Sequence, residues 1–386
     1  MTSDDNPKKK KRRLIGIISS LVSLAVMVYV TIAIISGRDF NWPKFSGLFS
    51  SRNPVGMVDE YHFEVGQRRV FADLGGSVAA VGTLGVQVLD FGGTETLREP
   101  FRMSTPAISA ANRRAVAFDI GGTFVRVFDE KGIFSAFETD GAIVSASINK
   151  NGWFCVCTQE GGGYRGVVTV YNNKGKSVFR AFLGSGYVLS SVLSPDNKNL
   201  AVLNLTDGGS RITFYNGLSK EEPGGTFDLP DELILDMRFI PDGKLIAVTT
   251  RSLIVVDISG GGGELYGFSG KRLGAYLLED DFIALHLLDY SVGFGGQLIT
   301  LGPDGRSLGE LITDRELISI SSSGGYLAIL RGDGYDFFNS ALEELPASGE
   351  TVPIVDADRI LVLEYGAALA TGDHSAITIR AANTES

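Results

Sequence analysis

Side chains that could carry acid–base or metal chemistry are few and widely scattered in this sequence. Its histidines are His62, His286 and His374, more than 80 residues apart, which is no metal-ligand spacing. His286 lies in an apolar run and is expected to be a core or channel side chain. The acidic pairs Asp280-Asp281 and Glu343-Glu344 could do general acid–base work, but both fall in expected turns, where a solvated charge is usual. No G-x-S-x-G, H-E-x-x-H or Walker A sequence is present, so we expect no catalytic, cofactor-binding or metal-binding residue.

Cys155 and Cys157 are the only cysteines in 386 residues. This number excludes a disulfide scaffold and a zinc cluster of four thiolates. Two positions apart on an expected strand, both side chains point to one face, and we expect a buried core pair. A strained redox-active disulfide or a metal site is the alternative.

Short motifs in expected turns invite functional interpretations. The segment from Asp119 to Arg126, DIGGTFVR, resembles the phosphate-binding segment of sugar kinases in the actin-like ATPase superfamily, but the other kinase motifs are not found. Arg331-Gly332-Asp333 matches an adhesion tripeptide. The acidic turns at 196–199 and 303–305 lack the D-x-[DN]-x-[DN]-G pattern of a calcium loop. We therefore interpret all four segments as turns between strands.

The elements that must position these side chains form a repeat. A turn of small or polar residues is followed by an apolar run, a gap containing glycine, and an alternating strand. The apolar runs begin at Val78, Ala115, Trp153, Leu200, Leu245, Phe282, Tyr326 and Ile360. Their mean spacing is about 40 residues, which is typical of a four-stranded propeller blade. The sequence predicts an all-β propeller of eight four-stranded blades, with seven as the alternative.

Two segments need separate interpretation within this repeat. Residues 275–292 contain no glycine or proline and could form a helix, but the repeat register predicts a strand, a turn at 279–281 and a second strand. The eighth repeat is compressed. Propellers commonly close their ring with strands from both termini, and Tyr61 to Val65, YHFEV, could supply such a strand.

Two of the turns carry a resemblance to known propellers. Ser194-Pro195-Asp196-Asn197 and Pro241-Asp242-Gly243-Lys244, each followed by a short apolar strand, resemble the SPDGK turn of WD40-like and TolB-like β-propellers. The chain has no Trp-Asp dipeptide, so the WD40 signature itself is absent. The resemblance implies the fold and no activity.

The N-terminal region has the composition of a membrane anchor. Residues 1–13 hold six cations and two acids, and Leu14 to Ser36 run for 23 residues without a charge or a proline. As a helix this run is about 34 Å long, enough to cross a bilayer. It is too long for a signal-peptide core and lacks an A-x-A-like site, so we expect an uncleaved anchor rather than a cleaved signal peptide.

The basic tail at 1–13 should remain in the cytoplasm, which places the C-terminal domain outside the membrane. Residues 37–60 are expected to form a juxtamembrane stalk, and 61–382 the propeller. Four aromatic residues of the stalk suit the headgroup level or pack beneath the propeller: Phe40, Trp42, Phe45 and Phe49. This layout resembles a family of uncharacterised membrane-anchored propellers of Gram-positive bacteria, which carries no known activity.

Composition and charge restrict the function. Glycine accounts for 49 of 386 residues and 44% of residues are hydrophobic, which excludes a disordered chain, a coiled coil and a multispan membrane protein. The net charge of −10 combines a +4 tail with a −14 remainder, which would repel nucleic acid.

We expect a non-enzymatic binding or scaffold module of the cell envelope, held in the lipid bilayer through Leu14 to Ser36, with an envelope protein or glycan as its partner and no cofactor. Two alternatives remain. The domain could be a hydrolase of envelope glycans or peptides that uses channel carboxylates. It could also be a sensory ectodomain that signals through a partner, because a 13-residue cytoplasmic tail is too short to fold.

Overall fold

The computed structural model describes residues 60–159, 163–219, 222–289, 293, 295–348, 357–363, 366–372 and 376–381. The predicted tail, anchor and nearly all of the predicted stalk lie outside these residues. Within the described ranges, no helix has the length and apolar character needed to cross a bilayer.

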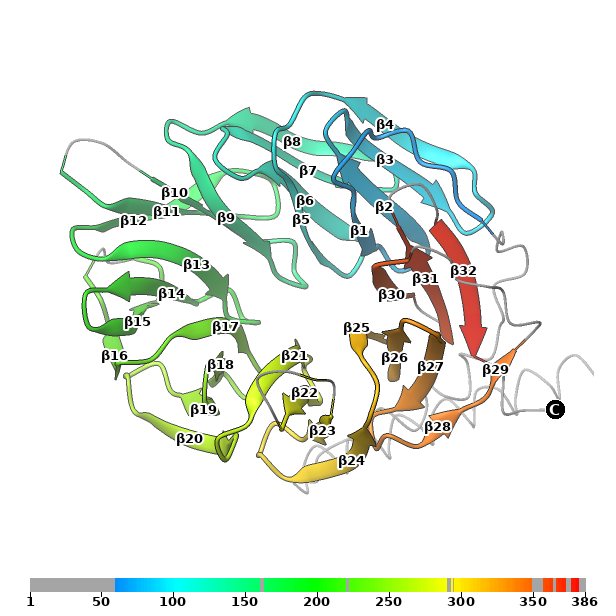
Figure 1. Cartoon of the computed structure of the whole chain (residues 1–386). Helices are drawn as coiled ribbons and strands as arrows, with labels where there is room; N and C mark the ends of the chain where they lie inside the picture. The colour runs from blue at the N-terminus through cyan, green and yellow to red at the C-terminus, as the bar shows by residue number, and fades with distance from the viewer. Residues whose placement is uncertain are drawn as a thin grey trace, which may run out of the picture. The chain divides into compact units, whose positions relative to one another are not determined.

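The described chain forms eight four-stranded antiparallel sheets arranged as blades of a ring around a common axis (Figure 1), and their inner strands line a central channel. Blades 1 to 4 are built from β1 (Val70–Asp73), β2 (Ser77–Gly82), β3 (Gly85–Asp90), β4 (Glu95–Pro100), β5 (Pro106–Ala111), β6 (Arg114–Asp119), β7 (Phe124–Asp129), β8 (Gly132–Glu138), β9 (Ile143–Ile148), β10 (Phe154–Thr158), β11 (Gly166–Tyr171), β12 (Ser177–Leu183), β13 (Tyr187–Leu193), β14 (Asn199–Thr206), β15 (Gly209–Asn216) and β16 (Gly225–Pro230).

Blades 5 to 8 are built from β17 (Ile234–Phe239), β18 (Leu245–Thr249), β19 (Ser252–Val256), β20 (Gly262–Gly267), β21 (Arg272–Leu278), β22 (Ile283–Leu288), β23 (Gly296–Leu301), β24 (Ser307–Thr313), β25 (Leu317–Ser323), β26 (Tyr326–Arg331), β27 (Gly334–Asn339), β28 (Glu344–Leu345), β29 (Ala347–Ser348), β30 (Arg359–Leu363), β31 (Ala367–Thr371) and β32 (Ala376–Ala381). The prediction of an all-β propeller with eight four-stranded blades is confirmed.

The position of a strand in its blade explains its sequence. In blades 1 to 7 the strands follow chain order from the channel outward. The second strand packs on both faces against neighbouring blades, so β2 and β22 are buried along their whole length and read as continuous apolar runs. The outer strand has a solvated face, and β12 alternates between exposed and buried residues. Of residues 275–292, the described part at 275–288 follows the predicted register, with β21 and β22 on either side of the turn.

In blade 8 the predicted register is wrong by one strand. The apolar run that begins at Ile360 forms the inner strand β30, and the second strand is β31, which begins at Ala367, 41 residues after Tyr326. The outer strand is β29, which precedes the other three in the chain. The sequence interval was misleading because β30, like a second strand, has an apolar core-facing run.

The ring closes differently from the prediction. Tyr61 to Val65 form no strand, and Glu60 makes a single bridge to Ile377 on β32. The segment is nevertheless extended: its apolar side chains (Tyr61, Phe63 and Val65) are buried, and the two between them (His62 and Glu64) are exposed. The buried three pack in one cluster with residues of blades 1 and 8. β29 pairs with β32 only at Ala381 and Arg380. The N-terminal segment meets the other end of β32 through Glu60 and the N–H of Tyr61 and seals the rest of the seam with side chains.

The ring has two faces, between which every strand runs. Face A is the side on which the inner strands end, and one cavity there is lined by the ends of β1, β5, β9, β13, β17, β21 and β25. Face B is the side on which the inner strands begin, and a second cavity there is lined by the starts of β1, β5 and β30.

Candidate ligand-binding cavity in the central channel

A large concave feature of the described residues is the channel cavity on face A, with a volume of about 960 Å³. All eight inner strands and several of the turns that follow them contribute to its wall. Six charged residues line it: Asp73, Lys150, Asp236, Arg238, Glu279 and Asp280. The volume is within the range typical of ligand pockets.

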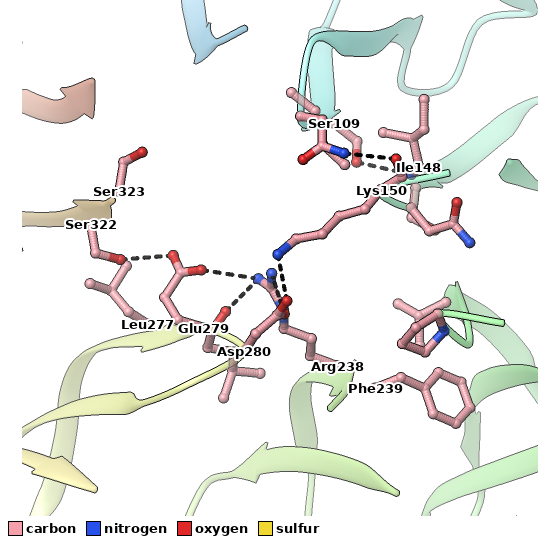
Figure 2. Close-up of a pocket in the computed structure, with 18 of the residues that line it drawn as sticks. Ser109, Ile148, Lys150, Arg238, Phe239, Leu277, Glu279, Asp280, Ser322 and Ser323 are labelled. Atoms are coloured by element: carbon pink, nitrogen blue, oxygen red, sulfur yellow. Dashed lines mark hydrogen bonds and ion pairs between the residues drawn. The ribbon is translucent and has the colours of Figure 1, made fainter. Parts of the chain in front are cut away.

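A charged network crosses this cavity (Figure 2). Arg238, on β17 of blade 5, places Nη2 at 2.9 Å from Asp280 Oδ1 and Nη1 at 3.6 Å from Glu279 Oε2. Lys150, in the β9–β10 turn of blade 3, reaches across the channel, and its Nζ donates to Asp280 Oδ2 at 2.5 Å. Ser322 on blade 7 donates its hydroxyl to Glu279 Oε1 at 2.7 Å. The network therefore connects four blades.

Local turn chemistry holds the two sides of this network. The β9–β10 turn is fixed by Asn149, whose Oδ1 accepts the backbone N–H groups of Asn151 and Trp153, each at 3.1 Å. Gly152 closes it with φ +75°, a conformation that favours glycine. On blade 6 the N–H of Glu279 donates to the carbonyl of Phe282 at 3.0 Å and closes the β21–β22 turn. Both turns thereby present their charged side chains at the channel mouth.

The two adjacent carboxyl groups have opposite pKa shifts. Burial raises the pKa of Glu279, and the charge of Arg238 and the hydrogen bond from Ser322 only partly oppose this effect. Burial also acts to raise the pKa of Asp280, but the hydrogen bond from Lys150 and the charge of Arg238 outweigh it, so that pKa lies below its usual value. At neutral pH Asp280 is the firmly ionised partner of the two cations.

Asp236 is a channel carboxylate without a close counter-ion. Its Oδ1 accepts the N–H of Met237 at 2.8 Å, and no Lys, Arg or His of the described chain lies within ion-pair distance. Burial raises the pKa of Asp236, against the effects of that hydrogen bond and of the Arg238 charge. Tyr276, on the next blade, has its pKa raised to about 12 by burial and by the charge of Asp236. The two side chains therefore share one part of the wall.

This arrangement favours binding of a cation over bond cleavage. The lining holds four carboxyl groups and two cationic side chains, a formal excess of two negative charges. Glu279 and Asp280 are both engaged by Arg238, so a role in proton transfer would require breaking an ion pair. Asp236 is the group with unused capacity, since a carboxylate can accept about four hydrogen bonds. Across the described residues, no three His, Cys, Asp or Glu side chains are grouped closely enough to hold a metal ion.

The cysteine pair lies in the core between blades 3 and 4, as predicted. Both residues are fully buried and unbridged. Cys155 lies 3.1 Å from the hydroxyl of Ser147, and Cys157 lies 3.1 Å from that of Ser191. Burial raises the pKa of both thiols, that of Cys157 to about 12. They are structural thiols and do not reach the cavity.

The two histidines of the described chain lie in different places. His286 is 3% exposed and its Nε2 lies 3.0 Å from the hydroxyl of Thr313, so of the two predicted places, core or channel, it occupies the core. Burial, with a smaller contribution from Arg272, lowers the pKa of His286. His62 is exposed at the seam, and His374 lies outside the described residues.

The kinase-like segment is a structural turn between β6 and β7, as predicted. Asp119 is buried, and its Oδ1 accepts the N–H groups of Ser104 and Thr105 at 2.9 and 2.6 Å. Gly122 approaches this carboxylate so closely that a Cβ would lie 2.4 Å from Oδ2. The aspartate and glycine therefore secure the chain leading into β5.

The adhesion-like tripeptide is also a turn, between β26 and β27. Arg331 places Nη1 at 2.7 Å from Asp336, and Nε at 3.5 Å from Asp333. Asp333 is also paired with Arg315. Both charged ends of the tripeptide thus have internal partners.

The predictions for the acidic turns agree with the structure in some cases and not in others. Glu343 is exposed and accepts the side-chain amide of Asn339 at 2.7 Å, consistent with the predicted solvated turn. The turn at 196–199 is stabilised internally, with the Ser194 hydroxyl on Asp196 at 2.6 Å, and the turn at 303–305 pairs Asp304 with Arg306 at 3.2 Å. For Asp280 the prediction of a solvated charge was wrong, because the β21–β22 turn directs it into the channel.

Sequence reasoning missed four residues of the cavity: Lys150, Asp236, Arg238 and Tyr276. A usable signal exists in β17, where charges interrupt an otherwise apolar strand, ILDMRF. Inner strands border the channel, so charges at such positions indicate channel-facing side chains.

Comparison with known proteins identifies the fold and a family, and no activity. BamB from Moraxella catarrhalis is similar in structure, with a TM-score of 0.51 and 15% sequence identity, and the match covers 84% of this chain and 99% of that chain. At this identity the likeness concerns the fold alone. No curated protein matches the sequence. A model described as a family of unknown function, DUF5711, matches residues 53–336.

Proposed function

The chain belongs to the DUF5711 family of unknown function, and we propose that it is a membrane-anchored binding or scaffold module that presents its face A cavity to a partner in the cell envelope. The observation that carries this proposal is the cavity itself, with a negative excess and a carboxylate, Asp236, that has no ion-pair partner among the described residues. A rigid ring with variable turns suits recognition.

The ligand chemistry follows from the charges. An incoming cation can pair with Asp236 and does not have to displace Lys150 or Arg238 from Asp280. Tyr276 beside it offers an aromatic ring, which also favours a cation. We therefore propose that the ligand is a protein segment that presents a lysine or arginine side chain, in preference to a neutral glycan.

The membrane location is part of the proposal. It rests on the uncharged run from Leu14 to Ser36 behind the basic tail, and it agrees with the resemblance to anchored propellers of Gram-positive bacteria. Alkaline extraction of membranes tests it. Retention of the full chain in the membrane is expected, and release into the wash would refute the anchor.

Crosslinking on intact cells followed by purification of the full chain tests the binding role. We expect one envelope protein to co-purify with the wild type and to be reduced about tenfold by Asp236→Asn, the loss of one charge-assisted contact. Asp281→Asn is the matched control, because Asp281 is exposed in the β21–β22 turn. Equal recovery with both variants, or no envelope partner, would refute the role of the cavity.

A hydrolase is the second candidate, and the opposite pKa shifts of Glu279 and Asp280 favour it. Pairs of carboxyl groups with separated pKa values are typical of acid–base sites. If the domain cleaves envelope glycans or peptides, Glu279→Gln should abolish release of soluble fragments from isolated cell wall. A sensory role is the third candidate. Because the tail at 1–13 is too short to fold, the domain would have to signal through a separate partner.

A further inference from the structure

Exposed apolar side chains are concentrated on one face of the ring. Thirteen large hydrophobic residues are exposed among the described residues, and three of them lie on face A: Phe134, Val178 and Leu308. The other ten lie at strand ends or turns of face B: Leu84, Ile120, Tyr164, Phe182, Tyr187, Leu189, Leu233, Leu235, Ile312 and Ile318. They occur on blades 1 to 7, around the ring instead of in one groove.

Three of the face B residues are exposed because of β-bulges. The ladder between the first two strands shifts register at Leu189 in blade 4, at Leu235 in blade 5 and at Ile318 in blade 7. A bulge leaves one residue unpaired and changes the direction of its side chain. The same irregularity thus exposes an aliphatic side chain near the start of three inner strands.

Blades 3 and 4 add aromatic rings and guanidinium groups. The rings of Tyr164 and Phe182 lie 5.0 Å apart, and Tyr187 is 56% exposed. Arg165 donates to the Tyr187 hydroxyl at 3.1 Å and lies over its ring, and Arg180 lies over Phe182. No carboxylate of the described chain is within ion-pair distance of Arg165. Tyrosine and arginine with apolar stems suit a boundary that is apolar on one side and wet on the other.

The described chain also begins on face B. Glu60 bridges to Ile377, and the N–H of Tyr61 donates to the carbonyl of Ala376 at 2.8 Å, at the face B end of β32. The uncharged run ends at Ser36, 24 residues earlier in the sequence. A chain that leaves a bilayer would therefore join the propeller on the face that carries the exposed apolar residues.

We propose that face B is a membrane-docking surface, which rests on the bilayer at the headgroup level and directs the face A cavity away from the membrane. This inference rests on the proposed anchor. A planar surface fits residues spread over seven blades better than a single peptide does. Because the chain after residue 13 carries a net charge of −14, the docking must be driven by apolar contact and not by attraction to anionic lipid.

The test uses the full chain reconstituted in phosphatidylcholine nanodiscs that contain a headgroup-level lipid quencher. A fluorophore is placed at Asp207→Cys, in the exposed β14–β15 turn on face B, or at Lys174→Cys, in the exposed β11–β12 turn on face A. Cys155 and Cys157 are fully buried, so labelling goes to the introduced thiol. We expect quenching at 207 and not at 174, unchanged from about 0.05 to 0.5 M salt.

Variants connect the quenching to the exposed rings. Combined Tyr164→Ser, Phe182→Ser and Tyr187→Ser should reduce the docked fraction at least about tenfold, and the face A control, Phe134→Ser, should not. Absent quenching at 207, or equal quenching at 207 and 174, would overturn the docking surface while leaving the anchor intact.

Release of the chain from nanodiscs by an alkaline wash would instead refute the anchor. The released chain would then be sedimented with phosphatidylcholine vesicles. Binding that the triple variant loses would support the docking surface, and no binding would overturn it.

Discussion

Replacement of Asp236 by asparagine is expected to stabilise the propeller at neutral pH. Its carboxylate is largely buried, accepts one N–H from Met237, and has no ion-pair partner among the described residues. Asparagine keeps the shape and the acceptor oxygen and removes the charge. A residue that destabilises the fold in this way is typical of a binding site.

The sign and size follow from linkage. Burial raises the pKa of Asp236 in the folded state, so the folded protein holds this proton more tightly than the unfolded chain does. The stability of the wild type therefore falls as the pH rises from about 3.9, the unfolded value, through the folded pKa. Each unit of elevation costs about 1.4 kcal/mol at neutral pH. Losing the attraction of Arg238 and weakening the Met237 hydrogen bond offset part of this, which leaves a gain of about 1 kcal/mol.

Denaturant unfolding at pH 7 and at about pH 3.5, below the unfolded pKa, separates this effect from a packing effect. The midpoint of Asp236→Asn should lie above that of the wild type at pH 7 and coincide with it at the lower pH. Asp281→Asn, in an exposed turn, should change stability by less than about 0.5 kcal/mol. Destabilisation at pH 7, or the same gain at both pH values, would refute the reasoning.

Three further predictions concern the buried thiols, the seam and the ion pair of the channel. Cys155 and Cys157 should resist a thiol reagent until the protein is denatured, since burial raises the pKa of Cys157 to about 12; rapid modification of the folded protein would contradict this. Phe63→Ala should lower the free energy of unfolding by about 3 kcal/mol by opening the seam, and a loss below about 1 kcal/mol would show that the seam does not depend on it. A double-mutant cycle of Lys150→Met with Asp280→Asn should give a coupling below about 1 kcal/mol, because the pair is partly exposed; a larger coupling would contradict that partial exposure.

The repeat was predictable because the burial of each second strand determines the composition of one short segment of sequence. A second strand is buried on both faces of its blade, as the strands that contain Val78 and Leu245 show. Such strands are therefore continuous apolar runs in the sequence. The same reasoning failed in blade 8, where the run from Ile360 is an inner strand whose local pattern is indistinguishable from that of a second strand. The identity of such a strand depends on which neighbours it pairs with.

The channel network was not predictable from local pattern. Lys150 and Asp280 are 130 residues apart and meet only because the ring places blades 3 and 6 across the channel. Asp280 has the sequence context of a solvated turn, and only the direction of that turn makes it a channel residue. The concentration of exposed apolar residues on face B was hidden for the same reason, since Tyr187 and Ile312 share a face only in the assembled ring.

Site-specific photocrosslinking in intact cells tests the central proposal most directly. A photoreactive phenylalanine that replaces Tyr276 lies in the cavity wall, and one that replaces Phe134 is exposed near the face A end of the outer strand β8. The proposed function predicts one envelope protein crosslinked from position 276, absent from position 134 and lost when Asp236→Asn is added. Equal crosslinking from both positions, or none from position 276, would contradict it.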